Sequence, residues 1–216
     1  MYKQIIIIGN SLKIKLKEFY LDLINSADLV ICADGGANHA HNLGIIPETI
    51  IGDCDSIEPA VYDYFKNQGS QIIKLVHDKD KTDMQLAIEH ALSLKPDRLI
   101  IIGAIGGRPD HTLANINLLA KPGEVGVKAK IVSEDCTLWL LSSGDKLELE
   151  AEPGDIVSLI PLTPEVDGIF TRGLKCPLSN AELYSTDSRG ISNKVVSLPV
   201  VVKVGAGRLL AIKLRN

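Results

Sequence analysis

The sequence predicts an α/β then all-β protein: a doubly wound, mostly parallel sheet domain followed by a small antiparallel β-sandwich. Continuous Ile- and Val-rich runs recur through residues 1–133, and stretches with helical spacing lie between them. Strands covered by helices on both faces have such continuous apolar runs, whereas half-exposed strands alternate. After about Ser133 the helical period disappears, and short apolar runs follow with Pro and Gly between them. We therefore expect an α/β domain at residues 1–133 and a β-sandwich at residues 134–216.

Strands and helices are expected to alternate along the first domain. Helical spacing of apolar residues separates the strands, for example at Leu12, Leu16, Phe19 and Leu23. This alternation predicts a parallel sheet with right-handed crossovers. The expected strands are residues 4–9, 28–34, 49–53, 71–76, 98–104 and 127–132.

The second domain is expected to contain only strands. Its apolar runs are short, Pro and Gly stand between them, and no helical period is visible, which is typical of an antiparallel sandwich or barrel. The expected strands are residues 137–141, 146–151, 155–162, 168–174, 194–205 and 208–214.

Composition excludes several classes of protein. A formal net charge of −4 without a Lys/Arg run gives no support for nucleic-acid binding. The four cysteines are scattered without a CxxC pair, so neither a zinc site nor a disulfide framework is expected. The N-terminal Ile run is too short for a signal sequence or a membrane span. We expect a cytoplasmic protein that binds no nucleic acid and no membrane.

Polar clusters follow four of the predicted strands. Ligands of open α/β sheets bind at the carboxyl ends of the strands, so these clusters are expected to form one site. They are ADGGAN at residues 33–38, GDCDS at 52–56, HDKDKTD at 77–83 and GAIGGRPDH at 103–111.

The GDCDS cluster places Asp53 and Asp55 two residues apart directly after a buried strand. If the backbone stays extended, both carboxylates lie on one face, with Cα atoms roughly 6.5–7 Å apart. A divalent metal between them would remove the repulsion between like charges. The alternative is a solvated turn, which does not explain two acids on one face.

The other clusters each have a functional and a structural interpretation. Asp34 is either a ligand or a helix N-cap, and Gly35 and Gly36 allow backbone N–H groups to approach a phosphate. Asp80 and Asp83 are expected to face the ligand.

Several residues in the last two clusters have their own expected roles. Lys81 could hold a phosphate as a point charge, and Asp80 or Thr82 could cap the following helix. In the last cluster Arg108 supplies a fork suited to phosphate oxygens, and Asp110 is either a functional acid or an N-cap. His111 and Asn115 are expected to line the pocket.

Clustered aspartates, glycine turns and an arginine suit a substrate that is a Mg²⁺-bound polyphosphate. The sequence contains no GxxxxGK[ST] P-loop, no GxSxG elbow and no GxGxxG after the first strand. A Rossmann oxidoreductase is therefore disfavoured, and phosphoryl transfer is favoured.

At this point the motifs carry a family resemblance. DGGAN (34–38), GDCDS (52–56), DKTD (80–83), GGRPDH (106–111) and RGISN (189–193), in this order, resemble the thiamine pyrophosphokinase family over nearly the whole chain. The resemblance implies transfer of a pyrophosphoryl group from ATP to the hydroxyl of thiamine, giving thiamine diphosphate and AMP, with Mg²⁺. It also implies a homodimer in which thiamine lies between the α/β domain of one subunit and the β-domain of the other.

The resemblance implies roles for single residues. Cys176 stands where relatives often carry an aromatic residue, and Asp187–Ser188–Arg189 where they often carry small ones. The implied catalytic residues are Asp53, Asp55, Asp80, Asp83 and Asp110, of which Asp53, Asp55 and Asp80 hold the metal. The implied ATP- or thiamine-contacting residues are Asp34, Gly35, Gly36, Ser56, Lys81, Thr82, Arg108, His111, Ser192 and Asn193.

Three alternatives stay open. The first is a pyrophosphokinase acting on another hydroxymethyl heterocycle, such as a pterin. The second is a non-catalytic sensor of nucleotide or thiamine. The third is a metal-dependent phosphohydrolase, which needs no acceptor.

Overall fold

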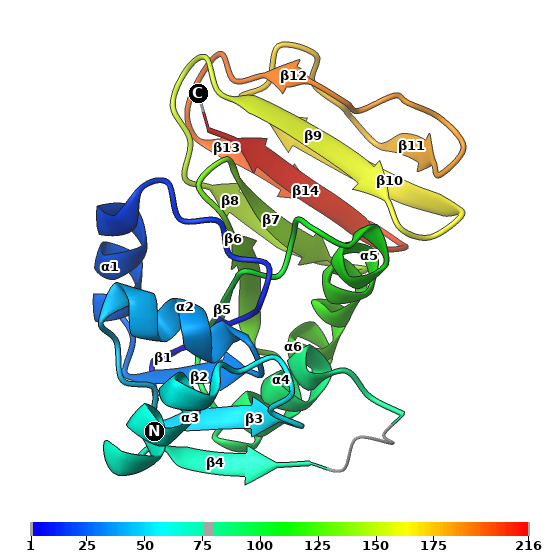
Figure 1. The fold of residues 1–216 in the computed structure, drawn as a ribbon. Helices are drawn as coiled ribbons and strands as arrows, with labels where there is room; N and C mark the ends of the chain where they lie inside the picture. Colours follow the sequence, from blue (N-terminus) through cyan, green and yellow to red (C-terminus); the bar gives the residue numbers. More distant parts are fainter. Residues whose placement is uncertain (1, 76–79, 216) are drawn as a thin grey trace. The chain divides into compact units, whose positions relative to one another are not determined.

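A computed structural model describes residues 2–75 and 80–215 of the chain. The chain divides into two compact units, Met1–Glu134 and Asp135–Asn216, each of which is described by itself (Figure 1). The division falls next to the boundary expected between residues 133 and 134.

The first unit is built on a parallel sheet. Within the described residues its strand order is β4-β3-β2-β1-β5-β6, and each neighbouring pair is parallel. The central strands are buried on both faces, which explains their continuous apolar sequence. The bounds are β1 Gln4–Ile8, β2 Leu29–Ala33, β3 Thr49–Gly52, β4 Gln71–Lys74, β5 Arg98–Ile102 and β6 Lys128–Val132.

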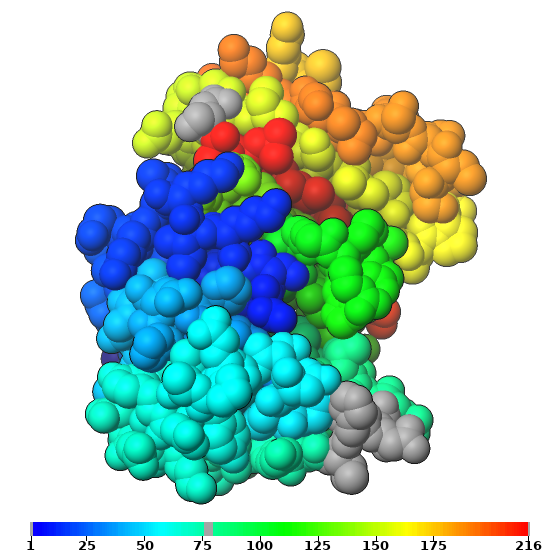
Figure 2. All heavy atoms as spheres, in the orientation of Figure 1, coloured from blue at the N-terminus to red at the C-terminus, as the bar shows by residue number. Residues whose placement is uncertain are grey.

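Helices cover both faces of this sheet (Figure 1). Alternate strand residues such as Ile6 and Ile8 pack with Tyr20, Ala37 and Phe65 of the first three helices. The opposite face carries the other alternate residues and is covered by the fourth helix, which contacts β1, β2 and β3. The bounds are α1 Lys17–Asn25, α2 Gly36–Leu43, α3 Pro59–Asn67, α4 Asp83–Ser93, α5 Pro109–Leu118 and α6 Ala120–Glu124. In the space-filling view the blue and cyan residues of α1 to α3 form a continuous outer surface (Figure 2).

The predicted helical face after the first strand is only partly correct. The helix α1 begins at Lys17, so Leu12 and Leu16 lie before it. Leu12 is nevertheless buried in the core, whereas the Leu16 side chain is exposed. The prediction from hydrophobic spacing alone therefore began this helix too early in the sequence.

The strand order reverses at β1. The chain moves outward from β1 through β2 and β3 to β4, and α4 then leads back to β5 on the other side of β1. The carboxyl ends of these parallel strands lie at one edge of the sheet, and such a reversal point is where open α/β sheets bind ligands. The loops that follow β1, β2, β3 and β5 therefore meet at this edge.

The second unit is an antiparallel β-sandwich, as predicted. Its sheets have the orders β12-β9-β14-β7 and β11-β10-β13-β8 within the described residues. Side chains from both sheets share one core, for example Leu159 and Leu209 with Val166 and Val202. The bounds are β7 Cys136–Leu141, β8 Lys146–Leu149, β9 Ile156–Pro161, β10 Glu165–Arg172, β11 Ala181–Tyr184, β12 Asn193–Lys194, β13 Val200–Lys203 and β14 Leu209–Leu214.

Two strand predictions in this unit need correction. The run expected as one strand at residues 194–205 is two strands, β12 and β13, which lie in different sheets. The strand β11 was not predicted, because only Leu183 of its four residues is buried and no apolar run marks it.

Among the residues that the structure describes, no helix is long and apolar enough to cross a lipid bilayer.

Candidate active site

The loops on either side of the strand reversal pack backbone against backbone. The N–H of Ser11, after β1, donates to the carbonyl of Gly103, after β5, at 2.9 Å. A Cβ atom on Gly103 would lie 2.3 Å from the carbonyl oxygen of Gly9, and one on Gly9 would lie 2.6 Å from that of Gly103. Only glycines permit this approach, so the base of the site is a fixed backbone surface.

Three aspartates converge at the neighbouring strand ends. Carboxylate oxygens of Asp34, Asp53 and Asp83 all lie within 4.8 Å of one another. They follow β2, follow β3 and open α4, respectively. A Cβ atom on Gly52 would lie 2.9 Å from the Cβ of Asp34 and 3.0 Å from Oδ1 of Asp83. Gly52 therefore leaves the space in which these carboxylates gather.

Asp34 is the buried member of this group. Its side chain is 7% exposed, and its Oδ1 has no hydrogen-bond partner among the described residues. Burial raises the pKa of Asp34, and the charges of Asp83 and Asp55 raise it further, although hydrogen bonds from Ser56 and Gly35 oppose the shift. A buried oxygen without a donor, close to other carboxylates, is suited to a cation.

Asp34 does not cap the helix that follows it. The N-cap of α2 is Gly35, and no side chain makes a cap hydrogen bond there. The structural alternative for Asp34 is therefore wrong. Gly36 lies so close to β1 that a Cβ atom would be 2.0 Å from the carbonyl oxygen of Ile8, which packs the start of α2 against the end of that strand.

The donors of the three-aspartate group fit Mg²⁺. This ion prefers carboxylate and water oxygens, and it commonly takes one or two carboxylates together with substrate phosphates. The group offers three carboxylates, one of them carrying the orphaned buried oxygen of Asp34. The sequence prediction instead named Asp53, Asp55 and Asp80 as metal ligands, and of these only Asp53 belongs to the group.

The extended backbone expected at GDCDS is not present. The strand β3 ends at Gly52, and Cys54 has a φ of 65°, so the chain turns between the two acids. Asp55 is exposed, and its N–H lies 3.3 Å from Oδ1 of Asp53 as the donor of a hydrogen bond. The prediction that both carboxylates share one face of an extended strand is therefore wrong. The hydroxyl of Ser56 donates to Oδ1 of Asp55 at 2.9 Å.

The start of α4 has the cap that its sequence predicts. Oγ1 of Thr82 accepts a hydrogen bond from the N–H of Gln85 at 3.2 Å. Asp83 is the first helical residue, and Asp80 is exposed in the preceding turn. Residues 77–79 of the predicted cluster lie outside the described residues.

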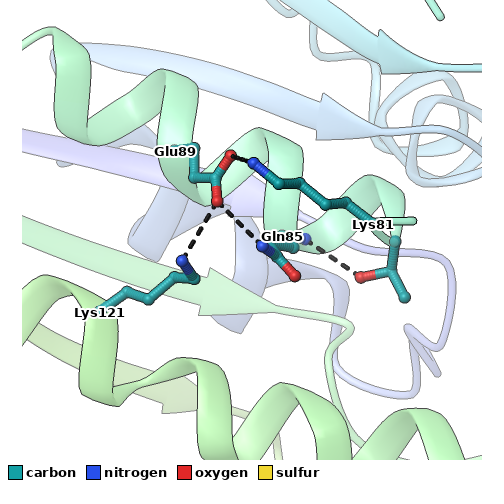
Figure 3. Close-up of polar contacts among 5 residues, drawn as sticks. Lys81, Gln85, Glu89 and Lys121 are labelled. Carbon is teal, nitrogen blue, oxygen red and sulfur yellow. Dashed lines mark hydrogen bonds and ion pairs between the residues drawn. The ribbon is translucent and has the colours of Figure 1, made fainter. Parts of the chain in front are cut away.

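Lys81 is directed along α4 toward Glu89 (Figure 3). Its Nζ lies 2.8 Å from Oε2 of Glu89, while Gln85 and Lys121 contact Oε1 of Glu89 at 2.9 and 3.2 Å. These donors, Gln85 first and then Lys81, lower the pKa of Glu89 to about 2. The role of Lys81 at a phosphate stays a prediction, and Glu89 was not foreseen from the sequence.

Two glycines and a threonine shape the loop that precedes α5. Gly106 and Gly107 have φ values of 108° and 64°, which non-glycine residues rarely adopt. Oγ1 of Thr112 accepts from the N–H of Gly106 at 3.2 Å and donates to the carbonyl of Arg108 at 3.1 Å. Arg108 is the N-cap residue and Pro109 begins the helix, so Asp110 lies in the first turn and is not the cap.

Arg108 and Asp110 form an exposed two-point ion pair. Nε of Arg108 donates to Oδ1 of Asp110 at 3.1 Å, and Nη2 donates to Oδ2. This pairing lowers the pKa of Asp110 to about 2. The side chain of His111 is exposed, whereas Asn115 is buried and donates to the carbonyl of Ala104 at 2.7 Å. Asn115 therefore anchors the loop, and the predicted place of His111 and Asn115 in the pocket wall stays a prediction.

Asn38 fixes the loop that carries Asp53 and Asp55. Its Nδ2 donates to the carbonyl of Ser56 at 2.8 Å, and its Oδ1 accepts from the N–H of Glu58 at 3.0 Å. The sequence contained a signal for this contact, because Asn38 ends the ADGGAN cluster. Its partners could not be identified until the β2 and β3 loops were placed together.

The predicted thiamine-side residues lie at the edge of the second unit. Ser192 has a φ of 58°, and its N–H donates to Oγ of Ser158 on β9 at 3.0 Å. Asn193 begins β12, and its side chain contacts the backbone of Cys176. Nothing in these contacts tests the predicted contact with thiamine.

Comparisons with known proteins agree with the motif resemblance. The family model described as "Thiamin pyrophosphokinase, catalytic domain" matches residues 20–132, and "Thiamin pyrophosphokinase, vitamin B1 binding domain" matches residues 146–209. "Thiamine pyrophosphokinase 2" of Oryza sativa subsp. japonica is 33% identical over 225 residues, covering 93% of this chain and 84% of that protein. The "Thiamine pyrophosphokinase" of Bacillus subtilis (strain 168) is 29% identical over 185 residues, covering 86% of each.

Solved structures show the same fold. The crystal structure of thiamine pyrophosphokinase from Bacillus subtilis has a TM-score of 0.88 at 26% identity, covering 99% of this chain and 100% of that one. That of yeast thiamin pyrophosphokinase has a TM-score of 0.83 at 20% identity, covering 99% and 87%.

Proposed function

The chain belongs to the thiamin pyrophosphokinase family, and from this premise we propose that it transfers the β,γ-pyrophosphoryl group of ATP to the hydroxyl of thiamine, releasing AMP. The observation that carries the proposal is the convergence of Asp34, Asp53 and Asp83 at the edge where this sheet class binds its ligands. A binding module has no need of such a concentration of acids close to a polyphosphate.

Asp34, Asp53 and Asp83 are the residues that would hold Mg²⁺. When bound, this ion offsets the negative charge of the acids and of the phosphates and thereby stabilises charge that develops during transfer. Asp55 and Asp80, which the sequence also suggests as ligands, lie on the adjoining turns and are candidates for contacts through water.

The remaining residues of this edge bind and orient the donor. Gly106 and Gly107 carry no side chains, so a phosphate can approach the backbone of their loop closely. Arg108 presents a guanidinium fork beside that loop, and Lys81 stands before α4. Their proposed task is positioning, which accounts for much of the catalysis in phosphoryl transfer.

The reaction exchanges one oxygen for another at the β-phosphorus. The thiamine hydroxyl oxygen bonds to this phosphorus, the bond to the bridging oxygen on AMP breaks, and the hydroxyl proton leaves. Carboxylates at this edge that do not hold the metal are the available acceptors for that proton.

The second unit is the proposed acceptor side. Residues 146–209 match the vitamin B1 binding domain, and this range includes Ser192 and Asn193. We also propose a cytoplasmic homodimer with thiamine between the α/β unit of one subunit and the β-sandwich of the other. The oligomeric state is measured by light scattering of the purified full chain.

The test is product formation from ATP and Mg²⁺ with and without thiamine, with AMP and thiamine diphosphate measured by chromatography. We expect equal amounts of both products, and loss of both when EDTA removes the metal. A hydroxymethyl pterin replacing thiamine tests the other acceptor. Nucleotide hydrolysis at the same rate with and without thiamine would indicate a phosphohydrolase. ATP binding without turnover would indicate a sensor.

A further inference from the structure

The side chain of Asn193 is already engaged within the second unit. Its Nδ2 donates to the carbonyl of Cys176 at 2.7 Å, and its Oδ1 accepts from the N–H of Cys176 at 3.0 Å. A carboxamide is the neutral side-chain group that offers a donor and an acceptor in the arrangement of a peptide group. Both ends of the Asn193 amide are thus used by the backbone of one residue.

This contact continues a short backbone ladder. Leu174 and Val195 form an antiparallel bridge, and the N–H of Lys175 donates to the carbonyl of Lys194 at 2.8 Å. The main chain of Asn193 pairs with Val157 of β9. The N–H of Cys176 therefore donates to the side chain of Asn193 and its carbonyl accepts from it, so the ladder reaches one residue further than the main chain alone allows.

We call the two hydrogen bonds between the Asn193 side chain and the Cys176 backbone the clamp. The segment that leads to Asn193 is itself fixed on β9. The carbonyl of Gly190 accepts from the N–H of Leu159 at 2.9 Å, and a Cβ atom on Gly190 would lie 2.7 Å from the carbonyl oxygen of Leu159. Ser192 is held by Ser158, which is buried. The segment before Asn193 thus has a defined position on β9. Through its side-chain hydrogen bonds, Asn193 fixes the backbone of Cys176 relative to the same strand.

The clamp holds two exposed side chains in a fixed relation. Cys176 is an exposed free thiol, and Ser192 is exposed on the segment that leads to Asn193. Both lie within residues 146–209, which match the vitamin B1 binding domain. We propose that Asn193 is a positioning residue, which fixes the backbone of Cys176 so that the surface carrying Cys176 and Ser192 keeps the shape that thiamine binding requires. This role rests on the proposed function and replaces direct contact of Asn193 with thiamine.

The experiment compares Asn193→Ala with the matched control Ser143→Ala. Ser143 makes the same kind of two-point contact in the same unit, accepting from the N–H of Gly207 at 3.0 Å and donating to its carbonyl at 3.5 Å. We expect similar melting temperatures for the two variants, because each loses comparable hydrogen bonds. The KM for thiamine is expected to rise about tenfold in Asn193→Ala only, and the KM for ATP to stay within about twofold in both.

A double-mutant cycle separates positioning from contact. If Asn193 acts through Cys176, the effects of Asn193→Ala and Cys176→Ala on the thiamine KM are less than additive. Full additivity, or an unchanged thiamine KM in a folded Asn193→Ala protein, overturns the proposal. Asn193→Asp serves if Asn193→Ala does not fold. It keeps the acceptor but places an oxygen against the carbonyl of Cys176, so the same rise in thiamine KM is expected.

Hydrogen exchange gives a readout that does not depend on turnover. The amide of Cys176 is expected to exchange faster in Asn193→Ala than in the wild type or in Ser143→Ala. If the wild type makes no thiamine diphosphate, the proposed function fails by itself. Faster exchange at Cys176 then still supports the clamp, and unchanged exchange overturns it.

Discussion

The α/β unit contains two kinds of carboxylate, and Asp34 and Glu89 represent them. Glu89 contacts two lysines and a glutamine (Figure 3), and these donors lower its pKa to about 2. Asp34 is buried near Asp53 and Asp83, and burial raises its pKa. The ionised form is thus favoured at Glu89 and disfavoured at Asp34 by the protein itself.

The difference between Glu89 and Asp34 indicates which carboxylates need a ligand to balance their charge. Lys81 and Gln85 lie eight and four residues before Glu89, so nearby sequence provides two of its donors, and Arg108 lies two residues before Asp110. The topology of the sheet brings Asp34, Asp53 and Asp83 together from separate elements. A carboxylate of the first kind stabilises the fold, whereas one of the second kind is kept at a cost in stability for binding.

The largest expected effect is that of Asp34→Asn. The amide is isosteric and neutral, so we expect a melting temperature above that of the wild type in Mg²⁺-free buffer, because a buried charge is removed. Turnover is expected to fall at least about a hundredfold, and Mg²⁺ is expected to raise the melting temperature of the wild type only. Thermal unfolding with and without Mg²⁺ and the coupled product assay measure both effects.

Asp63→Asn is the matched control for this variant, since Asp63 is exposed on α3. Asp63→Asn is expected to change neither the melting temperature nor the turnover. The distinction between the two kinds of carboxylate is wrong if Asp34→Asn destabilises the Mg²⁺-free protein. It is also wrong if Mg²⁺ raises the melting temperature of Asp34→Asn as much as that of the wild type.

An intermediate effect is expected for Gly52→Ala. The added Cβ would meet Asp34 and Asp83 at about 3 Å and push their carboxylates apart without removing any charge. We expect turnover to fall about ten- to a hundredfold, since small displacements of catalytic groups are costly, together with a loss of about 1–3 kcal/mol in the free energy of unfolding. Steady-state kinetics and urea unfolding measure the two effects.

Gly123→Ala on α6 is the control, because a Cβ atom there meets nothing within 4 Å. If Gly52→Ala retains full turnover, the spacing of the gathered acids is irrelevant to the reaction, and the proposed metal group loses its main structural argument.

The smallest effect is that of Glu89→Gln. Because the pKa of folded Glu89 is about 2, against an ordinary value of 4.5, its ion pairs stabilise the protein above pH 4.5. That contribution is lost as the pH falls from 4.5 toward 2. We expect Glu89→Gln to be less stable than the wild type by about 1 kcal/mol at pH 7, with the difference vanishing near pH 2, and to retain most of its turnover.

Urea unfolding across this pH range measures the difference, and Glu18→Gln on the exposed surface of α1 is the control. A pH-independent difference would mean that Glu89 acts by packing and not by charge. A large loss of turnover would move Glu89 into the same class as Asp34.

The sequence predicted most of the fold because the signals were local. The continuous apolar runs placed β1 to β6 within one or two residues, and Thr82, one of the two caps that the sequence suggested, is the cap of α4. The strand β11 was missed because it exposes most of its residues, and α1 began later than its hydrophobic spacing indicated.

The candidate site was predicted at the level of clusters but not of atoms. Asp53 and Asp55 were joined on the assumption of an extended chain, and the positive φ of Cys54 removes that assumption. The grouping of Asp34 with Asp83 depends on the order of strands and on the open space at Gly52, neither of which a spacing can show. Asn38 was missed because its partners are backbone groups of another loop, and Glu89 was missed although two of its three partners are close in sequence, because only the fold brings Lys121 to it.

The hydrogen bonds of Asn38 and Asn193 would be sensitive to loss of their amide groups. Each holds a backbone segment through an amide that donates at one end and accepts at the other. Spontaneous deamidation converts the donating nitrogen to an oxygen, which then faces the carbonyl of Ser56 or of Cys176. Either event adds a negative charge and turns an attraction into a repulsion. Deamidation at either position is therefore expected to loosen the backbone of Ser56 or of Cys176.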